Sequence, residues 1–432
     1  MRLVRQRSGC VSVITTNSFR PATPLQTNAM ARTTLGSTLS DTEIPITRQD
    51  AIRRLDAFVP VAASAYSRLR NKDRGQGGHI HVSRLSAALR RRLISEEEVV
   101  KAVLAAHGLA AAEKYVSEVF WRTYWKGWLE QRPAVWANYL KALQDSREAL
   151  DIRRDLTERY RAAVEARTGI DCFDGWASEL EQTGYMHNWA RMQFASIWIF
   201  TLGLPWQLGA AFMFDRLIDA DPASNTLSWR WVAGLHTAGK AYLADPERIR
   251  IMTDGRYAPK GLAQAARIPA DMAETASPAA IRLCHSPDPL AASVLLMTTE
   301  DLSVEQLADI RALRVKAVAV LQGRNGWDEV ALSDALARAR ETWPDAAHLS
   351  GDQASELASA CEDLGCTQIV TAFLPVGPVA SSVASWPSEF ARQGLRFTEY
   401  MRTWDRRAWP YCRKGFFGLK DKIPSLVQKM RD

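Results

Sequence analysis

The segment from residue 184 to residue 231 constrains this 432-residue chain more than any other stretch. Among its polar and aromatic residues are, in order, Tyr185, His187, Asn188, Arg191, Asp219, Asp221, Asn225, Trp229 and Trp231. In a helix, Asn188, Arg191 and Met192 are spaced three and four residues apart, so they share one face. Amide and guanidinium groups that face inward need hydrogen-bond acceptors, because burying them unpaired is unfavourable.

Two interpretations account for this pattern, and Asp219 and Asp221 are the nearest acceptors in both. One is a structural Arg–Asp pair inside a helical domain. The other is a ligand site, because two Asp, one Asn and two Trp lie close together between residues 219 and 231. That group is too polar for a plain core and too aromatic for a plain loop. It suits a large planar ligand with a polar edge.

The same residues resemble the FAD-binding domain of DNA photolyases and cryptochromes, whose signature reads roughly G-[WY]-M-H-N-R-x-R-M, then D-G-D-x-A-x-N, then W-x-W. The matching residues are Gly184, Tyr185, Met186, His187, Asn188, Arg191, Met192, Asp219, Asp221, Ala223, Asn225, Trp229 and Trp231. The resemblance implies an all-helical FAD-binding domain. At one position the sequence departs from the family, because Trp189 replaces an expected Arg. Losing that cation weakens a phosphate or lesion contact, unless the indole stacks on a flipped base instead.

The resemblance also implies a set of cofactor-binding residues. Upstream of the central segment, residues 82–86 resemble a segment that supplies hydroxyls and backbone N–H groups to the FAD diphosphate, with Val82 in place of a Thr. The alternative is that Ser83 or Ser86 is a helix N-cap. The expected FAD-binding residues are Tyr66, Ser83, Leu85, Ser86, Tyr115, Glu118, Arg122, Asn188, Arg191, Asp219, Asp221 and Asn225.

Individual roles follow from the same resemblance. Asn225 would face flavin N5, Asp219 and Arg191 would form a buried pair beneath the isoalloxazine, and Asp221 would bond its polar edge. The expected catalytic residues, which would line the cavity for a flipped pyrimidine dimer, are Glu118, Trp121, Asn188, Met192 and Trp231.

For electron transfer, Trp229 matches the member of the family's Trp chain nearest the flavin, and Trp206 matches the middle one. The distal member falls near Arg153, where no Trp stands, and Tyr160 is a possible substitute. The resemblance identifies no antenna chromophore, and we expect no metal site.

The chain is long enough for two or three domains. Residues 1–48 have no acidic residue before Asp41 and are rich in Arg, Ser and Thr, which predicts a transit peptide or a disordered tail. Met30 is an alternative start. The other expected divisions are a helical FAD-binding domain at 49–265, an Ala- and Pro-rich linker at 266–289 and an α/β domain at 290–432. In the last of these, apolar strands alternate with helices, which predicts a parallel sheet. The fold class is therefore mainly α, with a smaller α/β domain after the helical one.

The formal net charge of +7 fits a polyanionic partner, and we expect damaged DNA; protein partners are not assigned. The run Arg90-Arg91-Arg92 is either a solvated face or a nucleic-acid contact. The basic, aromatic stretch at 402–422 either touches nucleic acid or packs on the FAD-binding domain. Six scattered Cys predict reduced thiols in a cytoplasmic protein, or an organellar one if the leader is a transit peptide.

No membrane association is expected, although no charged side chain lies between Arg191 and Asp215. That stretch is long enough to span a bilayer on a hydropathy count. Gly203-Leu204-Pro205 interrupts it, which indicates two buried helices joined by a tight turn.

Three functions are consistent with these features. The first is an FAD-dependent, light-driven DNA repair enzyme that splits pyrimidine dimers by electron transfer from reduced flavin. The second is a cryptochrome-like blue-light photoreceptor without repair activity, and the third is a flavin-binding protein with neither role. The cavity residues Glu118, Trp121 and Trp231 favour the first, whereas Trp189 and the interrupted Trp chain favour the second.

Overall fold

The computed structural model describes residues 44–237, 239–269 and 277–430. The predicted leader lies almost entirely outside these residues, and the first helix begins at Arg48. Part of the predicted linker also lies outside them. The predicted domain boundaries therefore stay a prediction.

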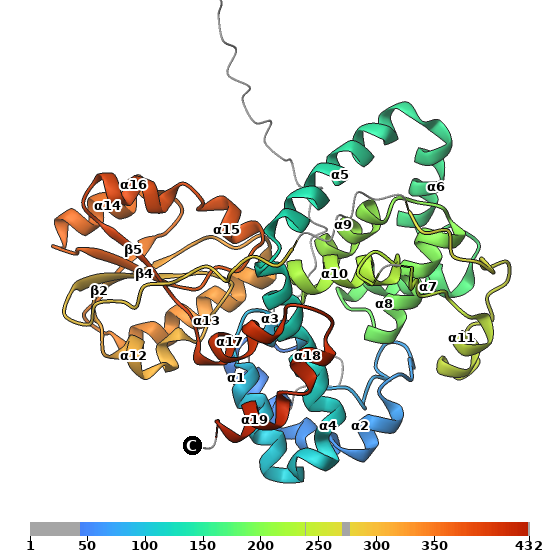
Figure 1. Ribbon diagram of the computed structural model, residues 1–432, viewed down its shortest axis with the longest axis horizontal. Coiled ribbons are helices and arrows are strands. Elements are labelled where there is room, and N and C mark those ends of the chain that lie inside the picture. Colours follow the sequence, from blue (N-terminus) through green and yellow to red (C-terminus); the bar gives the residue numbers. More distant parts are fainter. Residues whose placement is uncertain (1–43, 238, 270–276, 431–432) are drawn as a thin grey trace, which may run out of the picture. The chain divides into compact units, whose positions relative to one another are not determined.

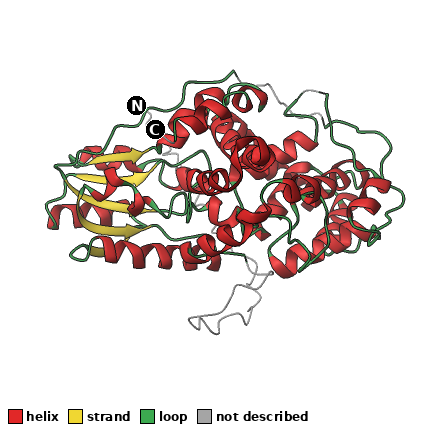
Figure 2. Cartoon of the chain, turned by 90° about the horizontal axis from the view of Figure 1, so that it is seen from below, coloured by secondary structure: helices red, strands yellow, loops and turns green. Residues whose placement is uncertain are grey.

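The first two thirds of the described chain are helical, as predicted (Figures 1 and 2). The elements are α1 (Arg48–Phe58), η1 (Val59–Val61), α2 (Ser64–Leu69), α3 (Ser86–Arg90), α4 (Glu96–Glu130), α5 (Pro133–Ile152), α6 (Arg154–Val164), α7 (Asp171–Thr183), α8 (Asn188–Ser196), η2 (Ile197–Thr201), α9 (Trp206–Arg216), α10 (Pro222–Val232) and α11 (Pro246–Met252). The break predicted near residue 203 separates η2 from α9. Among the described residues, no helix is both long enough and apolar enough to cross a bilayer.

Helix α4 is the element against which much of the molecule packs, including α2, α5, α10 and α17. It begins with a capping box, in which the Ser95 hydroxyl accepts from the Glu98 N–H and the Glu98 carboxylate accepts from the Ser95 N–H. Gly108 divides the helix, because its φ of 68° lies in the left-handed region. The second half of α4 is aromatic and mostly buried, and it supplies one wall of the site described below.

The α/β part contains a five-stranded, wholly parallel sheet, which confirms the predicted fold class. Its elements are β1 (Ala292–Met297), η3 (Val304–Gln306), α12 (Ala308–Arg311), β2 (Arg314–Val320), α13 (Gly326–Thr342), β3 (Ala347–Ser350), α14 (Ala354–Asp363), β4 (Gln368–Ala372), α15 (Pro378–Ser382), α16 (Trp386–Arg392) and β5 (Arg396–Tyr400). The strand order is β3-β2-β1-β4-β5. Helices α12 and α13 lie on one face of the sheet and α14 and α16 on the other (Figure 1).

The apolar runs at residues 293–298, 315–321 and 368–373 predict three strands, which are β1, β2 and β4, but no sequence pattern predicted the edge strands β3 and β5. The three inner strands carry runs of buried apolar residues, as strands covered on both faces do. Strand β3 alternates between half-buried and exposed residues, and β5 has a single buried residue, Thr398. Their sequences, AHLS and RFTEY, have no apolar run that distinguishes them from loop.

The carboxyl end of β1 faces the helical part and is packed with ion pairs. In parallel sheets of this kind, the point where the strand order reverses is the usual ligand crevice. Here that point lies between β1 and β4. Arg90 pairs with Glu300 just after β1 at 2.9 Å, and Arg91 pairs with Asp328 on α13 at 2.6 Å. Side chains of the helical part therefore occupy this edge of the sheet.

Both interpretations of the run 90–92 are wrong, because all three guanidinium groups are buried and paired. Arg92 lies 2.7 Å from an Asp405 oxygen and 3.2 Å from Glu96. Burial alone would lower the pKa of Arg92, but Asp405, Glu96 and Asp301 outweigh it and raise that pKa well above its usual value. Most of the partner carboxylates are hundreds of residues away in the sequence, so no local pattern could reveal them.

After β5 the chain returns to α4 through α17 (Thr403–Ala408), η4 (Trp409–Tyr411), α18 (Phe417–Lys420) and α19 (Ile423–Gln428). The Trp404 indole N–H donates to the Thr123 hydroxyl at 2.9 Å. Trp409 lies so close to Gly127 that a Cβ there would come within 2.7 Å of the indole. The prediction that this aromatic stretch packs on the helical part is confirmed for these side chains.

Candidate functional site

A cavity of about 520 Å³ lies between α2, α3, α4, α8, α9 and α10, a size typical of cofactor sites. The predicted residues that line it are Tyr66, Ser83, Ser86, Tyr115, Glu118, Trp121, Arg122, Asn188, Arg191, Met192, Asp219, Asp221, Asn225, Trp229 and Trp231. They come from segments more than 150 residues apart. Leu85 and Trp206 are the predicted residues that are not part of this lining.

The turn between α7 and α8 depends on Gly184, which ends α7 with a φ of 65°. A Cβ at this position would lie 2.6 Å from Ile218, so only Gly permits the close approach. The Ile218 N–H donates to the Gly184 carbonyl at 2.9 Å. This contact places the start of α8 beside the loop that carries Asp219 and Asp221.

The predicted pair of Arg191 and Asp219 is present, with 3.1 Å between Nη2 and Oδ1. Arg191 Nε also donates to the Met186 carbonyl at 2.8 Å, which orients the guanidinium. Burial raises the pKa of Asp219, but Arg191 and Arg122 outweigh it and lower that pKa below its ordinary value. The carboxylate is therefore a fixed negative charge in the cavity wall.

Asp221 is the N-cap of α10, and its Oδ1 accepts from the Ser224 N–H at 2.7 Å. Its other oxygen lies 3.2 Å from Arg122 and 3.8 Å from Lys126. Burial opposes ionisation, but Lys126, Arg122 and Arg90 outweigh it and lower the pKa of Asp221 to about 2. The predicted contact of Asp221 with the edge of a flavin ring stays a prediction.

Asn225 is held by α9, because its side-chain N–H donates to the Ala210 carbonyl at 2.8 Å. This bond fixes which end of the amide is the donor. Asn225 thus offers its carbonyl oxygen, an acceptor, to a ligand. An acceptor is the group that a protonated ring nitrogen such as flavin N5–H requires.

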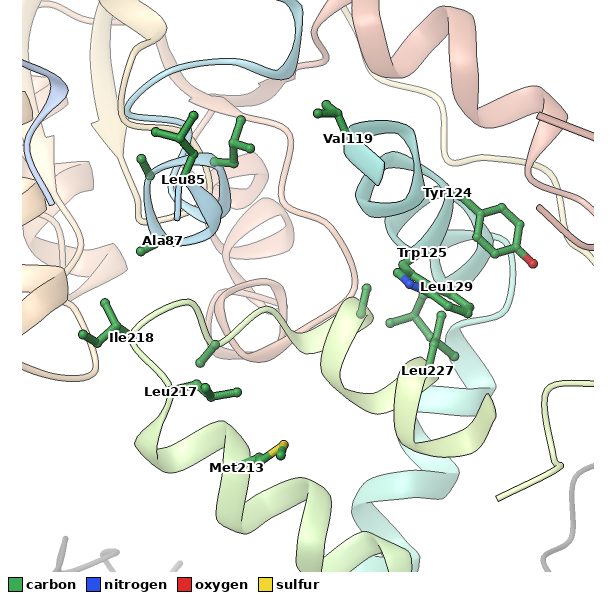
Figure 3. Close-up of a cluster of buried hydrophobic side chains, with 14 of the residues drawn as sticks. Leu85, Ala87, Val119, Tyr124, Trp125, Leu129, Met213, Leu217, Ile218 and Leu227 are labelled. Carbon is green, nitrogen blue, oxygen red and sulfur yellow. The ribbon is translucent and has the colours of Figure 1, made fainter. Parts of the chain in front are cut away.

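The segment 82–86 enters the site as a loop. Helix α3 begins at Ser86 and has no side-chain cap, so the N-cap alternative for Ser83 and Ser86 is wrong. The Leu85 side chain is buried (Figure 3), and its backbone N–H donates to the Ser83 hydroxyl at 3.4 Å. Arg84 has a φ of 56°, a conformation that costs energy in a non-Gly residue and persists only where the surroundings enforce it. Burial raises the pKa of Tyr115 to about 12, and the neighbouring Ser83 opposes that shift.

The predicted lesion-contacting residues form the more open side of the cavity. Glu118 pairs with Arg70 at 2.9 Å, a partner that the sequence analysis did not identify. Burial raises the pKa of Glu118, and Arg70 partly offsets this rise. Trp189, which replaces the family's Arg, is buried against Trp176 in an edge-to-face contact with 6.4 Å between ring centroids.

The aromatic contacts of Trp229 lead to a residue that the sequence analysis missed. Trp198, within the π-helical turn η2, packs edge-to-face on Trp229 with 6.1 Å between centroids, and it contacts Tyr160 at 6.0 Å. Both indoles lie against Gly209, where a Cβ would come within 2.3 Å of Trp229. Trp206 stacks on Tyr139 at 5.5 Å. The roles of Trp206 and Trp229 in electron transfer stay predictions.

Other lining residues were also missed, namely Arg70, Asn71, Arg84, Trp125, Tyr185, Ser224, Ser228, Tyr242 and Arg248. Tyr185 belongs to the matched signature, so its position there was a signal. The others carry no motif of their own.

Beneath the start of α8 lies a buried group of three residues that each offer a metal-ligand atom, Asp73, His79 and Glu179. Asp73 already accepts from the Trp176 indole at 2.7 Å and pairs with Arg256 at 3.0 Å. His79 lies 3.3 Å from Glu179. We infer that these contacts hold the loop at residues 73–79 against α7.

The cavity fits a ligand with planar, polar and anionic parts. The buried lining atoms without a hydrogen-bond partner within the described part of the chain include the Ser224 hydroxyl oxygen and the Trp189 indole nitrogen. Buried polar atoms of this kind usually have a partner, so these two mark positions for ligand contacts. Five guanidinium groups line the cavity, and such groups suit a diphosphate: Arg70, Arg84, Arg122, Arg191 and Arg248.

Comparison with known proteins agrees with this fit. A family model described as the FAD-binding domain of DNA photolyase matches residues 115–276. The deoxyribodipyrimidine photo-lyase of Streptomyces griseus is 35% identical over 156 residues, which are 36% of this chain and 32% of that protein. The enzyme of the same name from Thermus thermophilus is 30% identical over 203 residues, 44% of each chain.

Among solved structures, a class III photolyase from Agrobacterium tumefaciens is 29% identical, with a TM-score of 0.41, over 48% of this chain and 43% of that one. The chain thus spans less than half the length of these relatives. The matched part contains the signature residues and the helices that line most of the cavity. Residues 115–276 are therefore similar to the FAD-binding domain of DNA photolyases.

Proposed function

We propose that this chain binds FAD in the cavity and uses light to split pyrimidine dimers in DNA. The observation that carries the proposal is the arrangement of the cavity lining. The charged residues expected beside the flavin, Asp219 and Asp221, are buried. Those expected to contact the lesion, among them Trp121 and Trp231, are partly exposed and line the same cavity. In this arrangement, a cofactor would lie against the buried charged residues and a flipped base would lie next to it, against the partly exposed aromatic residues.

When bound, reduced FAD would supply the electron that splits the dimer after absorbing light. Arg191 and Asp219 would hold the flavin through fixed charges, and Asn225 would accept a hydrogen bond from it. The raised pKa of Glu118 favours its protonated form, which can donate a hydrogen bond to a base carbonyl. Arg70 keeps that carboxyl in place.

One observation favours the alternative of a photoreceptor without repair. Phe416 stacks on Trp121 with 3.9 Å between centroids and an interplanar angle of 13°. One face of the indole is therefore covered by the chain itself. A signalling protein needs no base-stacking surface there, whereas a repair enzyme must use the other face or the ring edge.

The test is to purify the protein, record its visible spectrum, and illuminate it with a dimer-containing oligonucleotide under reducing conditions. Bound flavin and loss of dimers in the light but not in the dark would support repair. Flavin that is photoreduced while the dimers persist would support the photoreceptor. A protein without flavin would contradict both.

Replacement of Trp229 by Phe is expected to slow photoreduction of bound flavin at least tenfold, because Phe is much harder to oxidise than Trp. The measurement is the rate of bleaching at the flavin absorption band under constant illumination with an external thiol. Trp343→Phe, in the α/β part, is the matched control and should react at the normal rate. A normal rate in Trp229→Phe would mean that electrons take another path.

A further inference from the structure

The segment 411–422 combines exposed aromatic rings with exposed cations. Phe417 is 75% exposed and Tyr411 40% exposed, which is unusual for rings of this size. Arg413 and Lys414 are exposed as well, and neither has an ion-pair partner within the described residues. Lys422 is also exposed and lies over the Tyr411 ring at 5.8 Å.

The backbone of this segment is anchored although its side chains are exposed. The Tyr124 hydroxyl on α4 donates to the Lys414 carbonyl at 2.7 Å, and Arg132 donates to the Arg413 carbonyl. Lys420 pairs with Glu113 on α4 at 3.0 Å. The cations are therefore presented from a fixed support.

The segment also adjoins the cavity. Trp121 lines the cavity on α4, and Phe416 stacks on it, so Phe416 is a positioning residue for the indole. Phe417, the next residue, faces solvent. Phe417 is therefore an exposed ring that follows, in the sequence, a residue packed on the cavity wall.

We propose that residues 411–422 contact the single-stranded stretch of nucleic acid beside a base that enters the cavity. Phe417 provides a stacking surface for a neighbouring base, and Arg413 and Lys414 contact phosphates. Proteins that bind single strands without sequence preference combine aromatic rings, which stack on bases, with basic groups, which contact phosphates. The inference rests on the proposed function, and it assigns strand binding to a segment that follows the sheet, outside the matched residues 115–276.

The charge of residues 411–422 favours a polyanion over a protein as the binding partner. Residues 411–422 contain Arg413, Lys414, Lys420 and Lys422 against the single acidic residue Asp421. Phosphates neutralise such a cluster at every nucleotide. A protein would need a matching acidic, apolar surface.

The experiment measures binding in the dark, by fluorescence anisotropy, of the full chain to a labelled oligothymidylate of about 16 nucleotides. The double variant Arg413→Ala, Lys414→Ala is expected to reduce the slope of log K against log salt by about 1.4, the value for two phosphate contacts on a single strand. Phe417→Ala is expected to weaken binding about tenfold and to leave that slope unchanged. The double variant Arg392→Ala, Arg396→Ala, on α16 and β5, should bind as the unmodified chain does.

The outcomes separate this inference from the proposed function. If illumination splits dimers but all variants bind with unaltered affinity and salt slope, the surface is not a strand contact and the repair function stands. If the variants lose affinity as expected while the unmodified protein leaves dimers intact, strand binding stands and repair is wrong. Unaltered binding by the variants overturns the inference in every case. Unchanged thermal midpoints show that the variants are folded.

Discussion

Replacement of Arg92 by Met is expected to destabilise the protein by about 3–5 kcal/mol, the cost of removing one member of a buried ion network. Arg92 lies within ion-pair distance of Glu96, Asp301 and Asp405, and all three carboxylates are buried. Burial raises the pKa of Asp405, and Arg92 is the cation that most opposes this rise. Without the guanidinium, the buried Asp405 carboxylate is therefore left without its main positive partner. The measurement is the free energy of unfolding from urea denaturation at pH 7.

Acid provides an internal check on this expectation. Burial raises the pKa of Asp405, so this carboxylate becomes protonated above its ordinary pH range, and the difference between Arg92→Met and the unmodified protein should shrink as the pH falls toward about 4. Arg154→Met is the matched control, because Arg154 forms an exposed helical pair with Glu158 and should change stability by no more than about 0.5 kcal/mol. A loss below about 1 kcal/mol at pH 7 in Arg92→Met would contradict the buried network.

Asp221→Asn is expected to destabilise the protein by about 2 kcal/mol at pH 7. Neighbouring cations lower the pKa of Asp221 to about 2 from an ordinary value of 3.8. A carboxyl group whose pKa is lowered on folding stabilises the folded state above its unfolded pKa. That contribution is lost as the pH falls from about 4 to about 2, so the variant and the unmodified protein should converge there. Unfolding free energies measured across this pH range test the expectation.

Asp245 provides the matched control for this substitution. It caps α11 through the Arg248 N–H at 2.6 Å, just as Asp221 caps α10, but it is exposed. Asn is a good N-cap, so both substitutions preserve the cap and differ in the buried charge that they remove. Asp245→Asn should change stability by less than about 0.5 kcal/mol. Equal effects at the two positions would show that the buried ion pairs of Asp221 contribute nothing.

The sequence alone predicted those features that depend on neighbouring residues or on residues at a fixed spacing. Arg191 and Asp219 were recognised because the signature places them at set distances, and the structure joins them. The inner strands were recognised because burial on both faces demands an apolar run. The close approach at Gly184 explains why the spacing is strict, since one added carbon would displace Ile218 and the loop that carries Asp219.

The tertiary structure decided what depends on partners distant in the chain. Arg90, Arg91 and Arg92 look like a solvated charge run, yet each is buried against carboxylates of the α/β part. Trp198 lies in an apolar stretch with no motif, and only folding brings it against Trp229. Phe416 reaches Trp121 from nearly 300 residues away. Spacing in a sequence encodes which residues share a helix face, whereas the compensation of buried charge and the stacking of distant rings exist only once the segments meet.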